Sequence, residues 1–512
     1  MRHWEKAFML VIAGCLTLQT GCSREVQEEP VTLTYWSDIR TRVSAYRADI
    51  PLYTELEKRL GVHLDIIDID AAETSQQFSI MLSSGSYPDI IEYNLSGYPG
   101  GARKAITDEV ILPLNDLMAE HAPNLSAQLA AHPAWEREVR TEDGLYYTFP
   151  MIRNNPKLCT YIGPALRKDW LEKLQLEVPK SIAEWENVLL KFKEIPGVEY
   201  PFAYEESVMK ASSAFMSAYG AKGVQEAFYY EDGKVHFSPA EASCRQFWTL
   251  WNRWYSMGLL APDFATSSHE VITEKISTGK VGATICRAGG GIGTYLQKAK
   301  EKSFDFVAAP YPTLDGQSHV KFSHNMPECA PFASVSTHCR NPEKAVEVLD
   351  YGYGEDGILL YNFGIENESF VFENGKPIYT DMVRQNPEGK SMSEILNLYV
   401  RSTHSGPFIQ NIGYMEQYMY RPQQQEALEV WTSNTDGTKY KMPQYTLTSE
   451  EQSRYNEIMI PVFEYIRTQE LQFVLGKRPL SEFQEYVTEL YSMGLGDAVK
   501  IVEQAVRRAE GM

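Results

Sequence analysis

The 512-residue sequence has no excess of positive charge, because 48 Lys and Arg stand against 68 Asp and Glu and the formal net charge is −20. A nucleic-acid-binding protein needs a cationic surface over the phosphates, and charge-driven binding to an anionic bilayer needs a polybasic patch. Both classes are therefore excluded. After residue 22, no segment supplies eighteen uncharged apolar residues, so no membrane-spanning helix is expected there.

Cysteine and catalytic motifs are also scarce. There is no CxxC and no paired zinc spacing, and no HExxH, GxSxG or EF-hand pattern. We therefore expect no metal, no cofactor and no catalytic residue. Most cysteines beyond residue 22 are interpreted as small buried apolar side chains, although the last two could pair in an oxidising compartment. These cysteines are Cys159, Cys244, Cys286, Cys329 and Cys339.

The glycine-rich run at residues 287–293 (RAGGGIG) invites a dinucleotide interpretation that fails, because Thr294 occupies the final glycine position of G-x-G-x-x-G. Backbone N–H groups at a helix start beside Arg287 would still suit a carboxylate or a hydroxyl-rich ligand. A tight turn against a sheet is the alternative. Trp248, Trp251 and Trp254 share one helical face, which favours core packing over sugar stacking.

The first 22 residues have the pattern of an export signal. Arg2 and Lys6 precede an apolar run of about twelve residues, which is too short to span a bilayer but suits a signal peptide. The run ends at Cys22 in a sequence that resembles a bacterial lipobox, so we expect lipidation at Cys22. Cys15 matches the lipobox better but leaves a shorter apolar run, and a plain secretory signal is a third interpretation. Residues 23–30 are a polar tether. The expected location is extracytoplasmic, with a lipid anchor in the cell membrane.

Length and apolar content predict two globular units. From residue 31 the pattern alternates between strand and helix, with strands at 31–36, 62–67 and 88–94 and helices between them. This rhythm predicts a parallel sheet, and ligands bind beyond the carboxyl ends of such strands. A second α/β region opens near Arg153, and the part from about Ser391 is mostly helical.

Several segments resemble type 1 extracellular solute-binding proteins, the substrate receptors of sugar-importing ABC transporters. The similarity is to the LipO-like branch of lipoproteins, which is related to receptors for alginate and glycosaminoglycan oligosaccharides, and it spans essentially the whole chain. The segments that carry it are the lipobox, Tyr35-Trp36, residues 87–94 (YPDIIEYN) with 97–101 (GYPGG), residues 168–174 (KDWLEKL) with Pro179, and residues 473–480 (FVLGKRPL).

The resemblance implies an α/β, two-lobed fold of the periplasmic-binding-protein type II, with a hinge and an interlobe ligand cleft. It places lobe 1 at residues 31–150 and 313–385, and lobe 2 at 151–312 and 386–512. The crossings between the lobes are expected near residues 147–151, 308–312 and 375–395. A monomer would bind an oligosaccharide, close around it and deliver it to ABC permease subunits.

The resemblance also implies ligand contacts at eight positions. Aromatic rings would stack on sugar C–H faces, while planar polar groups would bind hydroxyls. Trp36 with Asp38, and Tyr93 with Asn94, would act at strand ends of lobe 1, and Arg153 lies just past the first crossing. Tyr204, Glu205 and Arg287 would act from lobe 2. If both arginines face the cleft, the sugar is acidic and contains uronate.

Two other classes of function remain open from the sequence. An extracellular polysaccharide lyase or glycosidase would turn oligosaccharides over, and a peptide receptor would present main-chain hydrogen-bonding surfaces in place of aromatic platforms. Many members of the resembled family carry a calcium loop, but here residues 193–200 (KEIPGVEY) lack closely spaced Asp and Asn ligands. We therefore expect no calcium in this segment.

Overall fold

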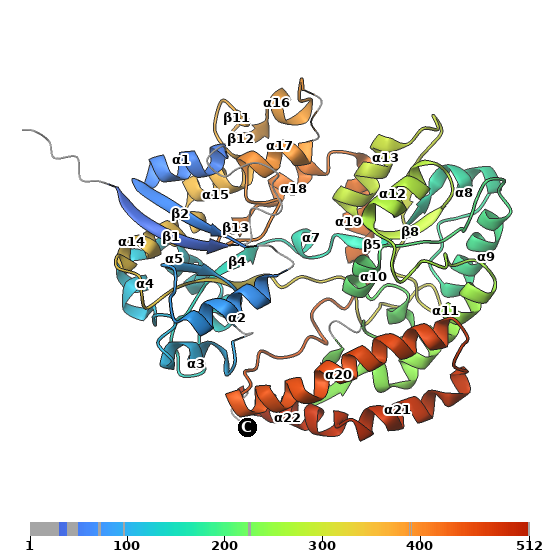
Figure 1. Cartoon of the computed structure of the whole chain (residues 1–512). Coiled ribbons are helices and arrows are strands. Elements are labelled where there is room, and N and C mark those ends of the chain that lie inside the picture. The colour runs from blue at the N-terminus through green and yellow to red at the C-terminus, as the bar shows by residue number, and fades with distance from the viewer. Residues whose placement is uncertain are drawn as a thin grey trace, which may run out of the picture.

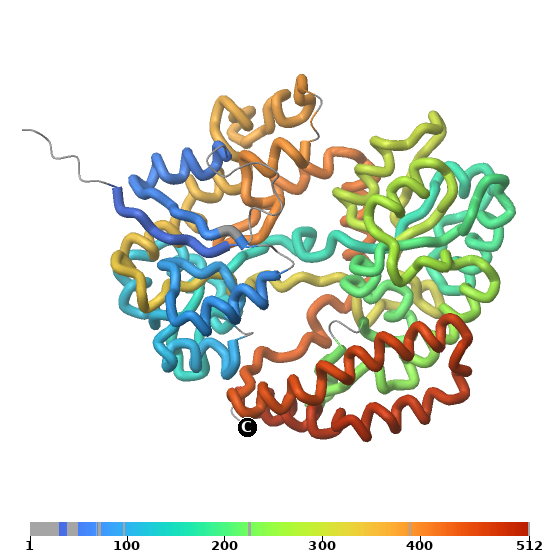
Figure 2. The backbone as a smooth tube through the Cα atoms, in the orientation of Figure 1, coloured from blue at the N-terminus to red at the C-terminus, as the bar shows by residue number. Residues whose placement is uncertain are grey.

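The computed structural model describes residues 30–37, 50–69, 73–95, 98–223, 227–388, 390 and 392–509. The predicted signal peptide, residues 23–29 of the tether, both candidate lipidation cysteines and Asp38 lie outside these residues. Two lobes lie side by side, and extended segments run between them (Figure 1, Figure 2).

Lobe 1 is built on a six-stranded sheet in the order β13-β4-β10-β3-β1-β2. Its strands are β1 (Val31–Ser37), β2 (Val62–Asp68), β3 (Ile90–Glu92), β4 (Phe149–Arg153), β10 (Cys329–Val335) and β13 (Ile409–Gln410). β1 runs parallel to both β2 and β3, whereas β10 is antiparallel to β3 and β4. The parallel sheet predicted for the first three strands is therefore confirmed.

A glycine ends each of the two crossover helices of this sheet. α1 (Pro51–Leu60) is followed by Gly61 at φ 62°, and α2 (Thr74–Ser84) is followed by Gly85 at φ 64°. Both glycines adopt the left-handed conformation that ends a helix and that side chains with a Cβ disfavour. The chain can then turn into the next strand, so the carboxyl ends of β1 and β3 come together at one edge of the sheet.

Lobe 2 packs helices around a three-stranded antiparallel sheet in the order β8-β5-β9. The strands are β5 (Ile162–Arg167), β8 (Ala283–Arg287) and β9 (Phe306–Ala308). α9 (Ile182–Lys193) begins at the capping box of Ser181 and Glu184. The three tryptophans of α11 (Ala242–Ser256) are fully buried, which confirms that they pack in the core.

The C-terminal part is helical, as expected, and lies along lobe 2 (Figure 1). α20 (Ser449–Val474) packs on α11 and on α22 (Leu495–Ala509), with α21 (Phe483–Ser492) between them in the sequence. The start of α20 and the end of α22 reach toward α3 (Gly101–Thr107) of lobe 1 (Figure 2). This end of the helical layer therefore takes part in the interface between the lobes.

The chain crosses between the lobes later than predicted. The first crossing runs from β4 to β5 through α7 (Pro156–Cys159). The return lies just before β10, because the Ala309 N–H donates to the Pro164 carbonyl, the Val320 N–H to Asn434 and the Met326 N–H to Cys159, all at 2.9 Å. Residues 313–326 therefore belong to lobe 2, and the predicted boundary at 312/313 is wrong.

The third crossing also differs from the prediction at residues 375–395. β13 pairs with β4 in the sheet of lobe 1, and α17 (Met392–Tyr399) packs on α1. α18 (Ile412–Tyr418) precedes the crossing, and α19 (Pro422–Ser433) packs on β9 of lobe 2. Residues 392–418 are thus part of lobe 1, although the prediction assigned them to lobe 2.

All five described cysteines are free, including the candidate pair Cys329 and Cys339. Four of them are buried, in agreement with their interpretation as small apolar side chains, and Cys339 is half-buried. Among the residues that the structure describes, no helix is both long enough and apolar enough to pass through a membrane.

Candidate functional site

Three aromatic side chains lie together at the carboxyl edge of the sheet in lobe 1. Tyr93 stacks on Phe78 with 3.9 Å between ring centroids, and Trp36 meets both rings edge-on at 6.2 Å. Trp36 is only 3% exposed, whereas Tyr93 is half-buried and Asn94 is exposed. Of the residues predicted at the strand ends of lobe 1, the structure therefore brings Trp36, Tyr93 and Asn94 together, with Trp36 beneath and Tyr93 and Asn94 at the surface.

A buried polar network holds these strand ends from below. The Glu92 carboxylate accepts hydrogen bonds from the Tyr35 hydroxyl and, at 2.5 Å, from the Ser37 hydroxyl, and it forms an ion pair with Arg401. Burial and the neighbouring Glu92 raise the pKa of Tyr35 well above its ordinary value, so its hydroxyl keeps the proton that it donates. Because Ser37 follows Trp36 and Glu92 precedes Tyr93, the network fixes the backbone at both aromatic residues.

A charged cluster lies at the corresponding edge of lobe 2. The Arg287 Nη1 atom donates to the Glu205 carboxylate at 3.0 Å, and His269 Nδ1 lies 3.6 Å from the same carboxylate. Hydrogen bonds from His269, Ser207 and Arg287 lower the pKa of Glu205 to about 2. The Arg287 side chain is 39% exposed. Two predicted residues that are 82 positions apart therefore form one ionised pair that a solute can reach.

Two other predicted residues do not reach the surface. Tyr204 is buried in the core of lobe 2, where its hydroxyl accepts a hydrogen bond from Trp251 Nε1 at 2.9 Å. Arg153 is buried at the first crossing, and its Nη1 donates to the Pro327 carbonyl at 3.0 Å on the second crossing. Burial lowers the pKa of Arg153. Its contact joins two crossing segments. Because Arg153 is buried there, it is not an accessible cation. The expectation of an acidic sugar depended partly on Arg153 being accessible.

A cavity of about 900 Å³ lies between the lobes. Lobe 1 contributes α3, α6 (Pro133–Glu138) and residues 140–147, and lobe 2 contributes residues 443–448 and the end of α22. Tyr147 and Tyr445 are among its lining residues, and the Tyr147 hydroxyl donates to the Glu138 carbonyl at 3.2 Å. None of the seven predicted contacts that the structure describes lines this cavity. Its lining loops carry no motif by which the sequence could have indicated them.

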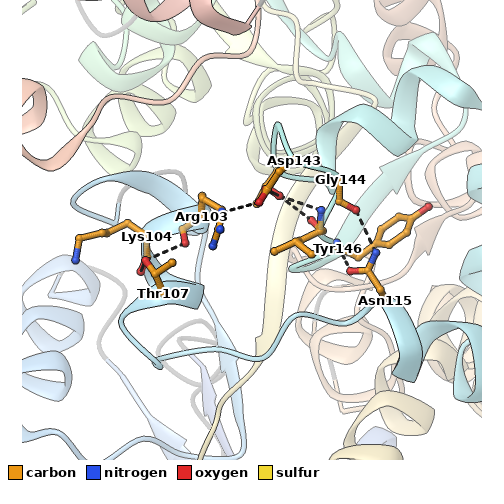
Figure 3. Close-up of polar contacts among 9 residues, drawn as sticks. Arg103, Lys104, Thr107, Asn115, Asp143, Gly144 and Tyr146 are labelled. Atoms are coloured by element: carbon orange, nitrogen blue, oxygen red, sulfur yellow. Dashed lines mark hydrogen bonds and ion pairs between the residues drawn. The ribbon is translucent and has the colours of Figure 1, made fainter.

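Hydrogen bonds brace the lobe 1 wall of the cavity (Figure 3). Arg103 Nε lies 2.7 Å from the Asp143 carboxylate, which also accepts a hydrogen bond from the Thr141 hydroxyl at 2.6 Å. The amide of Asn115 donates to the Gly144 carbonyl and accepts from the Tyr146 N–H. The loop at 141–146 is therefore tied both to α3 and to the start of α4 (Asn115–His121).

The lobes touch at the edge of this cavity. The Gln444 side chain donates to the Glu138 carbonyl, and the Ser449 hydroxyl donates to the Pro99 carbonyl, both at 3.4 Å. Gly101 has φ 69°, and a Cβ placed there would lie 2.1 Å from Thr446 Cγ2. Glycine is required at this position both for its backbone conformation and for the close approach of the lobes.

The segment that would hold calcium in the resembled family carries competing positive charge. Glu194 pairs with Lys191 at 3.1 Å, and Glu199 pairs with Lys280 at 3.2 Å. Among the described residues, no three His, Cys, Asp or Glu side chains are grouped so that they could hold a metal. The absence of calcium from residues 193–200 stays a prediction, which the charge pairing of Glu194 and Glu199 favours.

Calcium is expected to leave the thermal stability unchanged. A site that is filled at one hundred times its Kd would add about 2.7 kcal/mol to the free energy of unfolding, which a melting curve detects easily. We would compare chelator-treated protein with and without added calcium, using magnesium as the ionic-strength control. A rise in Tm at micromolar calcium would contradict the prediction.

Two α/β lobes joined by several crossing segments, with a cavity between them, define a class of proteins that enclose a solute by relative movement of the lobes. The family model for bacterial extracellular solute-binding proteins matches residues 40–358, and the chain belongs to that family. The resemblance inferred from the sequence is thereby confirmed.

Curated relatives match over much of their length. The fructooligosaccharide ABC transporter substrate-binding protein FusA of Streptococcus pneumoniae is 21% identical, over 97% of this chain and 96% of FusA. The lipoprotein LipO of Bacillus subtilis is 21% identical over 74% of each chain. Among solved structures, the alginate-binding protein AlgQ2 without calcium ion has a TM-score of 0.75 at 22% identity, over 94% of this chain and 98% of AlgQ2. These likenesses confirm the two-lobed α/β fold.

Proposed function

We propose that the protein is the substrate-binding component of an ABC importer and that it binds an oligosaccharide between its lobes. The observation that carries this proposal is the cavity between the lobes, which combines the half-buried ring of Tyr445 with dense hydrogen-bonding groups. Sugars need both, because their C–H faces pack on aromatic rings while their hydroxyls need polar partners. The sugar ligands named for FusA and AlgQ2 support the same class.

The strand-end groups complete the proposed binding surface. Tyr93 and Asn94 lie on lobe 1, and the ion pair of Glu205 with Arg287 lies on lobe 2. Tyr93 and Asn94 follow β3, and Arg287 ends β8. α10 (Glu206–Ser212), which Glu205 directly precedes, lies on the side of lobe 2 that faces lobe 1 (Figure 1). Closure of the lobes would bring both groups onto one solute. Trp36 supports Tyr93 in this proposal, and Asp38 stays a prediction outside the described residues.

The proposal includes the location and the partners. A lipid on Cys22, or on Cys15 as the alternative, would tether a monomer outside the cytoplasm, where it would deliver its solute to permease subunits. The name of LipO as a lipoprotein supports the anchor. We propose no enzymatic activity, in line with the binding-protein relatives.

A ligand screen with product analysis tests the function. The mature chain, residues 23–512, would be heated with neutral and acidic oligosaccharides and with peptides, and the sugars would then be analysed for cleavage. Stabilisation by an oligosaccharide without turnover is the expected result, because a ligand that binds only the folded state raises Tm. Turnover would point to the polysaccharide-degrading alternative. Stabilisation by peptides alone would point to a peptide receptor.

Replacing Tyr93 by Ala is expected to weaken oligosaccharide binding about tenfold, because the variant loses a stacking platform worth roughly 1–1.5 kcal/mol. Isothermal titration with the sugar from the screen measures the effect. Tyr491→Ala is the control, since that side chain is exposed on α21 away from both candidate surfaces. Equal affinity of the Tyr93 variant and the wild type would remove Tyr93 from the site.

A further inference from the structure

Arginines line the cavity between the lobes, but most of them already bind a carboxylate of the chain. The lining arginines are Arg103, Arg137, Arg140 and Arg508. Arg103 pairs with Asp143 at 2.7 Å, and Arg140 pairs with Glu136 at 2.7 Å. Arg508 holds Glu451 through two hydrogen bonds of 2.7 and 2.6 Å. The cavity is therefore rich in guanidinium groups without being positively charged.

The carboxylates in these pairs are ionised at neutral pH. Hydrogen bonds from the Thr141 hydroxyl and the Arg103 guanidinium lower the pKa of Asp143, and hydrogen bonds from the Tyr146 hydroxyl and Arg140 lower the pKa of Glu136. Glu138 and Glu142 also line the cavity. The described lining therefore holds three carboxylates and four guanidinium groups, and Glu136 and Glu451, which pair with Arg140 and Arg508 without lining the cavity, add two further carboxylates.

The arginine of the charged cluster on lobe 2 is also paired with a carboxylate of the chain. Arg287 is the exposed cation there, and it is bound to the ionised Glu205 at 3.0 Å. Arg153, the other cation expected to face an acidic sugar, is buried. Among the described residues, the arginines of both candidate surfaces are therefore paired with carboxylates except Arg137, an exposed side chain of the cavity lining. Once the paired groups are set aside, Arg137 stands against Glu138 and Glu142, so the described part of the cavity lining has no surplus of positive charge.

We infer that the solute is an uncharged oligosaccharide, an inference that rests on the proposed function and narrows its substrate class. An arginine–carboxylate pair offers donors and acceptors side by side, which suits vicinal hydroxyls. An acidic sugar would have to displace a carboxylate of the chain from Arg103, Arg140 or Arg508, or bind Arg137 beside Glu138, and it would meet the like charges of Asp143 and Glu142. This conclusion replaces the expectation of a uronate-containing ligand that depended on Arg153 and Arg287.

Sugar pairs that differ only in charge test the inference. One pair is an oligogalacturonide and its full methyl ester, and another is a glucuronic-acid-substituted xylo-oligosaccharide and its methyl ester. A broad panel of neutral oligosaccharides accompanies them. We expect at least one neutral sugar to bind, and the acidic member of any bound pair to bind at least tenfold more weakly at low salt. An acidic member that binds equally or more tightly overturns the inference but leaves oligosaccharide binding intact. Binding of no sugar overturns the proposed function and the inference together.

A variant at Asp143 tests whether this cavity discriminates between neutral and acidic sugars. Asp143→Asn keeps the shape of the side chain but leaves Arg103 without its carboxylate, so we expect the preference for the neutral sugar to fall at least threefold. Asp497→Asn is the control, because that exposed carboxylate lies at the far end of α22 from Arg508. Unchanged discrimination in the Asp143 variant would overturn the assignment of charge selection to this cavity.

Discussion

Replacing Arg401 by Ala is expected to lower the free energy of unfolding of lobe 1 by about 3–5 kcal/mol, the cost of leaving a buried charge without its partner. Arg401 and Glu92 are both buried, and their ion pair joins the segment before β13 to the end of β3. Without the guanidinium, the Glu92 carboxylate keeps only the hydroxyls of Tyr35 and Ser37 as side-chain partners among the contacts described.

Replacing Arg401 by Ala is also expected to weaken sugar binding at Tyr93. Glu92 directly precedes Tyr93, so relaxation of the end of β3 would disturb the stacking of Tyr93 on Phe78. Chemical denaturation and sugar titration would be measured together. Arg59→Ala is the matched control, because Arg59 pairs with Glu55 of the same lobe near the surface, where such a pair contributes about 0–1 kcal/mol. Equal losses in the two variants would contradict the role of burial.

The second large loss of stability is expected for a substitution of Arg167 in lobe 2. Its side chain is 0% exposed, and it binds the Asp169 carboxylate through two hydrogen bonds of 2.7 and 2.6 Å and Glu301 at 2.5 Å. The guanidinium carbon also lies 4.4 Å from the centroid of the Trp170 ring and 4.3 Å from that of Phe304. Arg167→Ala removes an ion pair and a cation that lies between two rings, so we expect a loss of about 3–5 kcal/mol.

This loss should be confined to lobe 2. Denaturation followed by hydrogen exchange would show reduced protection in β5 and its neighbours, while β1 to β3 keep theirs. Arg253→Ala is the control in the same lobe, because Arg253 is half-exposed and pairs with Glu186 at 2.5 Å. A uniform loss of protection across both lobes would show that the lobes unfold as one unit, contrary to the expectation.

The elements that the sequence predicted well are those specified by neighbouring residues. The alternation of strand-like and helix-like segments located β1, β2 and β3 and the helices between them. These signals act over a few residues, and burial of one strand or helix face reinforces them. The carboxyl edge of the sheet, with Tyr93 and Asn94, could therefore be located from local patterns.

The positions of the crossings could not be located in this way. β13 has only two residues and carries no alternation, yet its pairing with β4 assigns the whole segment before α19 to lobe 1. Likewise, the stretch before β10 stays in lobe 2 because single backbone hydrogen bonds attach it to Asn434 and Cys159. Pairing between segments so far apart leaves no short-range signature.

The sequence by itself determined the family, the α/β class, the acidic surface and the residue types at the strand ends, because these depend on composition and on short-range order. The tertiary structure decided which of those residues are accessible: it buried Tyr204 and Arg153, and it joined Glu205 to Arg287. It also formed the interlobe cavity from segments near residues 140 and 445. Burial and charge pairing depend on contacts between distant segments. An arginine side chain can bind a ligand as a free cation, or it can already be neutralised by a carboxylate of the chain. Folding decides between these two states because it places the carboxylate beside the arginine.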